Sequence, residues 1–149
     1  MEENNIDKTW LLSWECPTDE INPAAIKVMP SHSKYGPLSF ERCISYVERA
    51  PEKFVLGYAP DLRRPDAIDQ LKAAIDTYGV RICGEVKVRM MYDNPDALKF
   101  FRFCGEEGLP VILHMQYPME EEYRYPRSNW WYGGTIKTLE RVLQACPDT

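Results

Sequence analysis

The sequence contains few of the side chains that form metal sites or disulfide frameworks. Its 149 residues include only two histidines and five cysteines, and no two cysteines are spaced as C-x-x-C. A thiolate zinc site or a disulfide framework requires closer grouping of cysteines. We therefore predict that the cysteines are buried thiols of a protein in a reducing cytoplasm.

Several other signatures are absent, and each absence narrows the class of protein. No run of about 18 apolar residues occurs, which argues against a membrane-spanning helix. The net charge of -5 and the pI near 5.1 argue against nucleic acid or an anionic membrane surface as a partner. A Gly-rich phosphate loop, a G-x-S-x-G elbow and an H-E-x-x-H motif are all missing. We expect a cytoplasmic protein that binds neither nucleic acid nor membrane.

The sequence does contain a strand followed by a helix, repeated four times. Apolar runs predict strands at about residues 9–14, 54–59, 82–88 and 110–114. Helical periodicity follows each strand, with predicted starts at Ser39, Pro65, Asn94 and Thr135. Alternating strands and helices predict a parallel sheet, and the length argues for a single domain over residues 1–149.

The connections between these elements are uneven. Helix-to-strand links are short, whereas two strand-to-helix links, 15–38 and 116–134, are long. A (β/α) barrel and a flavodoxin-like open sheet both place function at the carboxyl ends of the strands. Four units are half of what a closed barrel of about 250 residues requires, and both ends of the chain look cut. We therefore predict a partial (β/α)8 TIM barrel, incomplete at both ends, whose parallel strands follow one another in chain order.

His114 is the histidine with the more informative position. It follows four apolar residues at the carboxyl end of a predicted strand, where barrel enzymes place catalytic groups. Because side chains alternate along a strand, Pro110, Ile112 and His114 share one face. Metal ligation is one interpretation, and a hydrogen-bonded histidine at the rim of the sheet is the other. The second histidine, His32, lies in the polar loop 30–34 and is predicted to be solvated.

Glu85 and Lys87 are charged residues within a predicted strand. They are two residues apart and share a face, with Val86 and Val88 on the other. The valines suit the layer beneath the helices, which points the two charges toward the barrel interior. A buried charge is costly unless it is paired or bound. The two side chains therefore either contact a substrate or a metal-bridging group, or form a structural ion pair with each other.

The long segment 116–134 combines aromatic side chains with acidic and arginine residues. Its aromatic members are Tyr117, Tyr123, Tyr125, Trp130, Trp131 and Tyr132. Such a segment fits a substrate lid or stacking wall. A partner surface and plain packing across the mouth of the barrel are the competing interpretations.

Several stretches resemble one known family, the amidohydrolase-related TIM-barrel metal hydrolases of the amidohydrolase superfamily. They are 5–8, 84–87, 93–96, 108–114 and the helix 139–147, and the resemblance runs from about residue 5 to the end. The segment G-L-P-V-x-x-H, which ends at His114, is the most specific part. In that family the fifth strand carries a metal-binding histidine, which matches His114. The fourth strand often carries a lysine, which matches Lys87.

The resemblance implies a divalent metal, with zinc the first candidate, bound by His114. It implies hydrolysis of a small-molecule substrate, in which metal-activated water attacks an amide, ester or lactone. A related branch of the family resembles metal-dependent decarboxylases, and a non-catalytic α/β binding domain is an alternative of another class. The family's His-x-His pair, sixth-strand histidine and final aspartate are missing. We therefore expect the activity to belong to a longer parent protein.

The isolated chain is predicted to behave as an incomplete barrel. One histidine and one carboxylate leave a zinc ion mostly hydrated, so the chain alone should bind zinc weakly and be inactive. A half-barrel also exposes unpaired strand edges. The chain alone should therefore be poorly stable or form a homo-oligomer.

Overall fold

The computed structural model describes residues 1–15, 38–115 and 133–149. Its elements are a 3-10 turn (Glu2–Asn4), β1 (Thr9–Leu12), α3 (Phe40–Arg49), β2 (Phe54–Gly57), α4 (Ala67–Tyr78), β3 (Cys83–Val86), α5 (Pro95–Glu106), β4 (Val111–Leu113) and α6 (Ile136–Ala145). The predicted alternation of strands and helices is confirmed. No helix in these three stretches is long and apolar enough to cross a membrane. The predictions for His32 and for nearly all of the segment 116–134 fall outside the described residues.

The four strands run parallel and form two pairs. β1 pairs with β2 in an uninterrupted register, whereas β3 pairs with β4 with a shift in register between Cys83 and Val86. A bridge between Gly57 and Ile82 joins the two pairs, and there the Tyr58 N–H donates to the Ile82 carbonyl at 3.0 Å. The predicted parallel arrangement in chain order is therefore confirmed. In the described part of the chain no ladder joins β1 to β4, so the strands do not close into a barrel.

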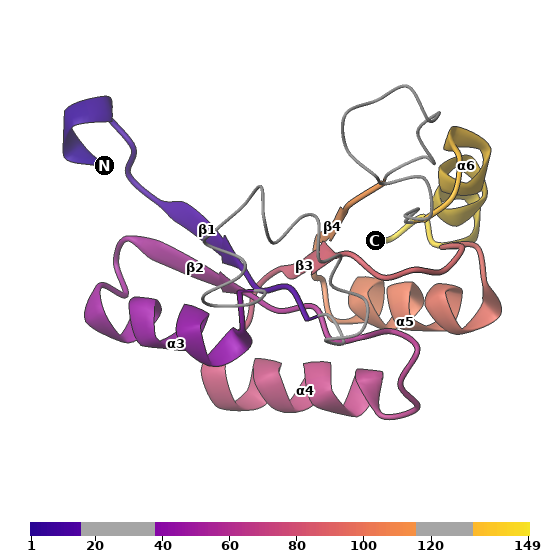
Figure 1. Cartoon of the computed structure of the whole chain (residues 1–149), viewed down its shortest axis with the longest axis horizontal. Helices are drawn as coiled ribbons and strands as arrows, with labels where there is room; N and C mark the ends of the chain where they lie inside the picture. Colours follow the sequence, from indigo (N-terminus) through magenta and orange to yellow (C-terminus); the bar gives the residue numbers. More distant parts are fainter. Residues whose placement is uncertain (16–37, 116–132) are drawn as a thin grey trace, which may run out of the picture.

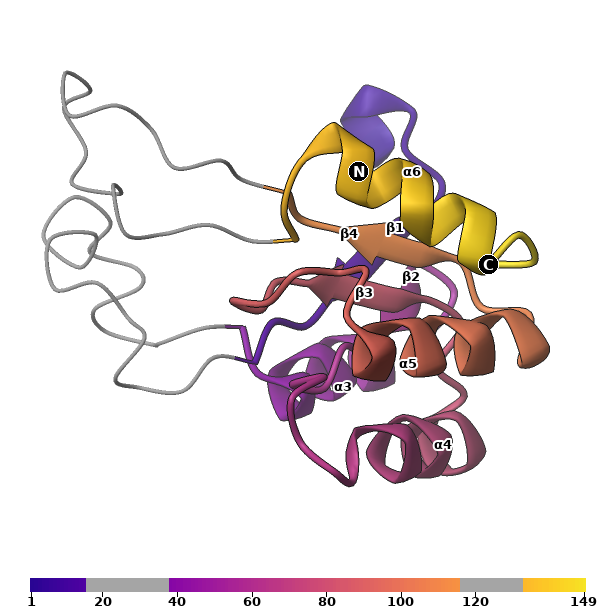
Figure 2. The same cartoon turned by 90° about the vertical axis from the view of Figure 1, so that its right-hand side faces the viewer.

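The helices lie against these strands, with α3, α4 and α5 on one side of them (Figures 1 and 2). The end of α6 lies beside α5, where the Arg102 side chain donates to the Ala145 carbonyl at 3.3 Å. Beyond α6, the Thr149 hydroxyl donates to the Phe101 carbonyl at 2.8 Å. Between helices and strands lie the largest fully buried apolar side chains, among them Leu71, Val80, Val86, Phe100 and Phe101. Burying side chains of this size contributes roughly 1.5–3 kcal/mol each.

Four of the five cysteines belong to this buried layer. Cys43, Cys83, Cys104 and Cys146 are free thiols, and all four are buried. Burial raises the pKa of the Cys43 thiol to about 11, which keeps it protonated near neutral pH. The prediction of buried thiols is confirmed for these four, and Cys16 lies outside the described residues.

Local sequence signals set several helix ends. The Asn94 side chain accepts a hydrogen bond from the Asp96 N–H at 2.9 Å, and Pro95 is the first residue of α5. Gly79 ends α4 with a φ of 67°, in the left-handed region that favours glycine. The predicted start of α4 at Pro65 is wrong, because a turn occupies that position and Asp66 is the N-cap instead.

The strands are shorter than predicted, and α6 is more exposed. β4 begins only at Val111, since Pro110 has no N–H to donate to a ladder. β1 ends at Leu12 because the next carbonyl, that of Ser13, accepts from the Glu85 N–H at 3.0 Å instead of from β2. In α6, Ile136 and Leu143 are 59% and 57% exposed, although their helical spacing in the sequence predicts that they face inward.

Candidate functional site

The carboxyl end of β3 presents its charged and apolar side chains to opposite faces. Val86 and Val88 are buried, whereas Glu85 and Lys87 are only partly buried. This alternation follows from the two-residue period of an extended chain. The predicted orientation is confirmed: the valines lie in the core, and the two charged side chains point away from it.

Glu85 meets His114 across the β3–β4 pair. The Glu85 Oε1 lies 2.6 Å from the His114 Nδ1, and the two side chains keep 33% and 28% of their exposure. A carboxylate accepts at this distance, so Nδ1 carries the proton and donates it. The hydrogen bond with His114, aided by the charge of Lys87, holds the pKa of Glu85 below its usual value against the opposing effect of burial. The structure thus joins two of the predicted site residues.

Backbone hydrogen bonds fix the strands that carry this pair. The His114 N–H donates to the Val86 carbonyl at 2.9 Å. The Tyr92 hydroxyl lies 2.9 Å from the Val86 carbonyl and 3.0 Å from the His114 carbonyl. The hydroxyl lies between the ends of β3 and β4, and the two carbonyl acceptors share its single proton. The acid and the imidazole are therefore held by strands that are themselves tied together.

Tyr92 is a supporting residue that the sequence patterns did not reveal. Its side chain is 1% exposed, and its ring meets the Phe101 ring edge-on at 6.0 Å between centroids. Gly133 lies against the same ring, where any Cβ would overlap Tyr92, and it adopts a φ of 75°. A tyrosine in a predicted loop carries no periodic signal, and only the packing shows its role.

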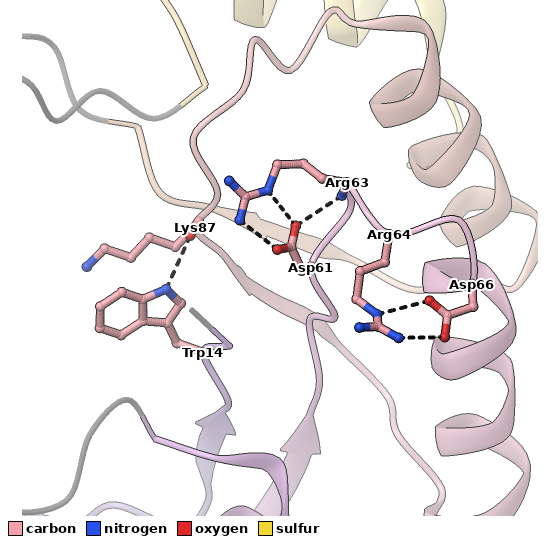
Figure 3. Close-up of polar contacts among 6 residues, drawn as sticks. All are labelled: Trp14, Asp61, Arg63, Arg64, Asp66 and Lys87. Atoms are coloured by element: carbon pink, nitrogen blue, oxygen red, sulfur yellow. Dashed lines mark hydrogen bonds and ion pairs between the residues drawn. The ribbon is translucent and has the colours of Figure 1, made fainter. Parts of the chain in front are cut away.

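Lys87 is held by Trp14, a residue that follows β1. The Trp14 indole N–H donates to the Lys87 carbonyl at 3.2 Å, and the Lys87 Nζ lies 4.2 Å from the centroid of the indole ring. Figure 3 shows the ring beneath the lysine side chain. Such a cation–aromatic contact stabilises the charge at this position. Trp14 was predicted only as part of a strand, so its contact with Lys87 is a finding of the structure.

Two arginine–aspartate pairs follow β2, on the segment between β2 and α4. Arg63 binds Asp61 with two nitrogens, at 2.8 and 2.6 Å, and Arg64 binds Asp66 in the same way, at 2.9 Å for both contacts. Each pair joins residues two apart in sequence (Figure 3). A cavity of about 240 Å³ lies between this segment and α5, and its lining does not include the Glu85–His114 pair. The two regions are therefore distinct.

The fit of a metal rests on His114. Because Nδ1 donates to Glu85, Nε2 is the ring nitrogen that could hold a metal, as in the carboxylate–histidine–metal arrangement. Zinc in a catalytic site takes about three protein ligands. Within the described ranges, no group of three histidine, cysteine or acidic side chains is close enough to hold an ion. The described residues thus fit one ligand with its supporting carboxylate, and not a whole site.

Comparisons with known proteins support the fold. No model of a protein family and no curated protein sequence matches the chain. Among solved structures, 2,6-dihydroxybenzoate decarboxylase from Rhizobium aligns with a TM-score of 0.61 at 19% identity, over 99% of this chain and 51% of that enzyme. The 5-carboxyvanillate decarboxylase from Sphingomonas paucimobilis aligns with a TM-score of 0.64 at 17% identity, over 99% and 47% of the two chains.

A third solved structure points the same way. A Staphylococcus aureus protein that has been assigned as an amidohydrolase aligns with a TM-score of 0.50 at 15% identity, over 87% of this chain and 48% of that protein. The chain spans about half the length of the proteins it resembles. At such low identity, the likeness establishes a shared α/β fold.

Proposed function

We propose that this chain forms about half of a metal-dependent TIM-barrel enzyme of the amidohydrolase superfamily. The observation that carries the proposal is the 2.6 Å contact between Glu85 and His114 at the carboxyl ends of two parallel strands. That end of the strands is where barrel enzymes place their active sites. The alignment of nearly the whole chain with about half of two barrel enzymes supports the same conclusion.

In this proposal each residue of the pair has a separate role. His114 binds the metal through Nε2, and Glu85 accepts from Nδ1–H, which fixes the tautomer and the orientation of the ring. Lys87 contributes a positive charge on the same face as Glu85, where it suits an anionic part of the substrate. A divalent ion, zinc in the first instance, supplies Lewis-acid chemistry when bound.

Two reactions are compatible with this assembly. Hydrolysis of an amide, ester or lactone follows from the family resemblance of the sequence. Decarboxylation of an aromatic acid has a specific observation in its favour, because the solved structures with TM-scores of 0.61 and 0.64 are aromatic-acid decarboxylases. The cationic Lys87 above the Trp14 ring also suits an aromatic carboxylate. We therefore propose decarboxylation first and hydrolysis second.

The test uses the protein encoded by the whole reading frame that contains these residues. Zinc content is measured by elemental analysis after dialysis, together with carbon dioxide release from 2,6-dihydroxybenzoate and hydrolysis of ester and lactone substrates. His114→Ala should abolish stoichiometric zinc and all turnover. The matched control is His32→Ala, which changes the other histidine and should leave both intact. Zinc binding that survives His114→Ala would overturn the proposal.

Residues 1–149 alone provide a second measurement. Since the described residues supply no group of three ligands, we predict that this chain binds zinc weakly and shows no turnover. Equilibrium dialysis with zinc checks the first point. Stoichiometric zinc in this chain, with activity that His114→Ala abolishes, would show that the missing ligands lie within it.

A further inference from the structure

Trp14 makes two different contacts with one residue, Lys87. Its indole N–H donates to the Lys87 main-chain carbonyl at 3.2 Å, and its ring lies under the Lys87 ammonium, with 4.2 Å from Nζ to the ring centroid. The residues are 73 positions apart in sequence. One contact fixes the backbone of Lys87, and the other fixes the far end of its side chain (Figure 3).

A lysine side chain needs such support to hold its charge in one place. Four carbons separate its backbone from its ammonium, and each bond between them rotates. The neighbours Val86 and Val88 are buried and anchor the strand end from the opposite face. The Trp14 ring attracts the ammonium through its electron-rich face. Trp14 and the two valines thus define where the Lys87 charge lies.

That charge lies near the Glu85–His114 pair. Lys87 lies two residues after Glu85 and on the same side of the chain, opposite the buried Val86 and Val88, and the Glu85 carboxylate contacts the imidazole of His114. This side of β3 thus carries the Lys87 ammonium, packed on the Trp14 ring, beside the Glu85–His114 pair. An ammonium of this kind binds a carboxylate through charge-assisted hydrogen bonds.

We infer that Trp14 is a positioning residue, which holds the Lys87 ammonium where it binds the carboxylate of a substrate beside the Glu85–His114 pair. This inference rests on the proposed function and adds to it the residue that places the anion-binding group. Trp14 acts through Lys87 and does not itself bind the carboxylate. The neutral ester of the same acid should therefore be insensitive to changes at Trp14.

The experiment compares an acid with its ester in the protein encoded by the whole reading frame. The probes are 2,6-dihydroxybenzoate and its methyl ester, and their affinities are measured by isothermal titration calorimetry. Lys87→Met should weaken binding of the acid about tenfold or more, as expected for a lost charge-assisted contact. Trp14→Ala should weaken it about three- to tenfold through the lost cation–aromatic contact. Trp14→Phe, which keeps an aromatic face, should recover part of that loss.

A double variant separates positioning from a merely structural role. In Trp14→Ala combined with Lys87→Met, the acid should bind as in Lys87→Met alone, because Trp14 then has no ammonium to place. Binding of the ester should change less than about twofold in every variant, since no charge is involved. The controls are Trp10→Ala and Lys72→Met, which alter an exposed tryptophan and an exposed lysine.

Three results would overturn the inference. One is an equal loss of acid and ester in Trp14→Ala, which would indicate a structural role only. Another is a double variant whose losses multiply, and the third is wild-type protein that does not prefer the acid to the ester. The proposed function is tested separately, by whether His114→Ala removes the bound zinc.

Discussion

The two strand pairs of this molecule differ in regularity and in what they carry. β1 and β2 pair in one uninterrupted register, and the ion pairs that follow β2 join residues two apart. β3 and β4 pair with a shift in register, and the polar contact at their carboxyl ends joins residues 29 apart. Backbone hydrogen bonds form the ladder of the regular pair, and just beyond its end the Ala59 N–H donates to the Ser13 hydroxyl at 3.4 Å. The irregular pair also uses a buried side chain, Tyr92, and it carries the candidate site.

The largest expected effect comes from removing that support. Tyr92→Ala deletes a buried aromatic ring and should lower the free energy of unfolding by about 3–5 kcal/mol. Tyr92→Phe keeps the ring but removes the hydroxyl proton that the Val86 and His114 carbonyls share. The Val86 carbonyl still accepts from the His114 N–H, so the substitution should cost about 0.5–1.5 kcal/mol. Urea denaturation measures both. Tyr78→Phe, at a half-exposed tyrosine of α4, is the control, and equal losses at the two sites would contradict the distinction drawn between the strand pairs.

Glu85→Gln tests whether the long-range pair at the ends of β3 and β4, unlike the local pairs after β2, supports metal binding. The amide cannot accept from the His114 Nδ1–H with the strength of a carboxylate, so zinc affinity should fall about 10- to 100-fold. Asp61→Asn makes the same chemical change in the local pair after β2 and should leave zinc affinity unchanged. Competition with a chelator in the protein of the whole reading frame gives both values. An equal loss in the two variants would show that the effect is one of net charge.

The Glu85–His114 contact should also make the stability of the fold depend on pH. The pKa of Glu85 is lower in the folded chain than its usual value of 4.5, mainly because of the hydrogen bond with His114. Its stabilising contribution is therefore present above that usual value and disappears as the pH falls through the lowered pKa. Urea denaturation should show a gap in stability between wild type and Glu85→Gln at about pH 5.5 that narrows toward about pH 3. A difference in stability between the two proteins that increases as the pH falls would contradict this prediction.

The smallest effect is expected at the exposed pair after β2. Arg64 and Asp66 keep 55% and 44% of their side-chain exposure, so solvent screens their attraction. Arg64→Ala should leave the midpoint of urea denaturation unchanged within error. A clear shift of the midpoint would mean that the Arg64–Asp66 pair stabilises the fold more than is expected for a solvent-exposed ion pair.

The helix ends illustrate how much local chemistry can be predicted. Asn94 and Pro95 at one end of α5, and Gly79 at the end of α4, can be identified from sequence because capping needs only neighbouring residues. The predicted start at Pro65 was wrong because Pro65 lies inside a turn of the folded loop, in which the Ala67 N–H donates to the Arg64 carbonyl at 3.2 Å. Ile136 and Leu143 have helical spacing in the sequence, but helical spacing does not indicate how far a neighbouring layer extends over a helix.

By itself, the sequence determined the parallel strand–helix repeat, the opposite faces of Glu85 and Val86, and the place of His114 at the carboxyl end of a strand. These features follow from residue period and from position within one element. Only the tertiary structure decided that Glu85 contacts His114, that Tyr92 ties the strands beneath them, and that Trp14 holds Lys87. Each of these contacts joins residues from different elements. No local pattern encodes such a pairing, because the distance between the partners is set by how the strands and loops pack.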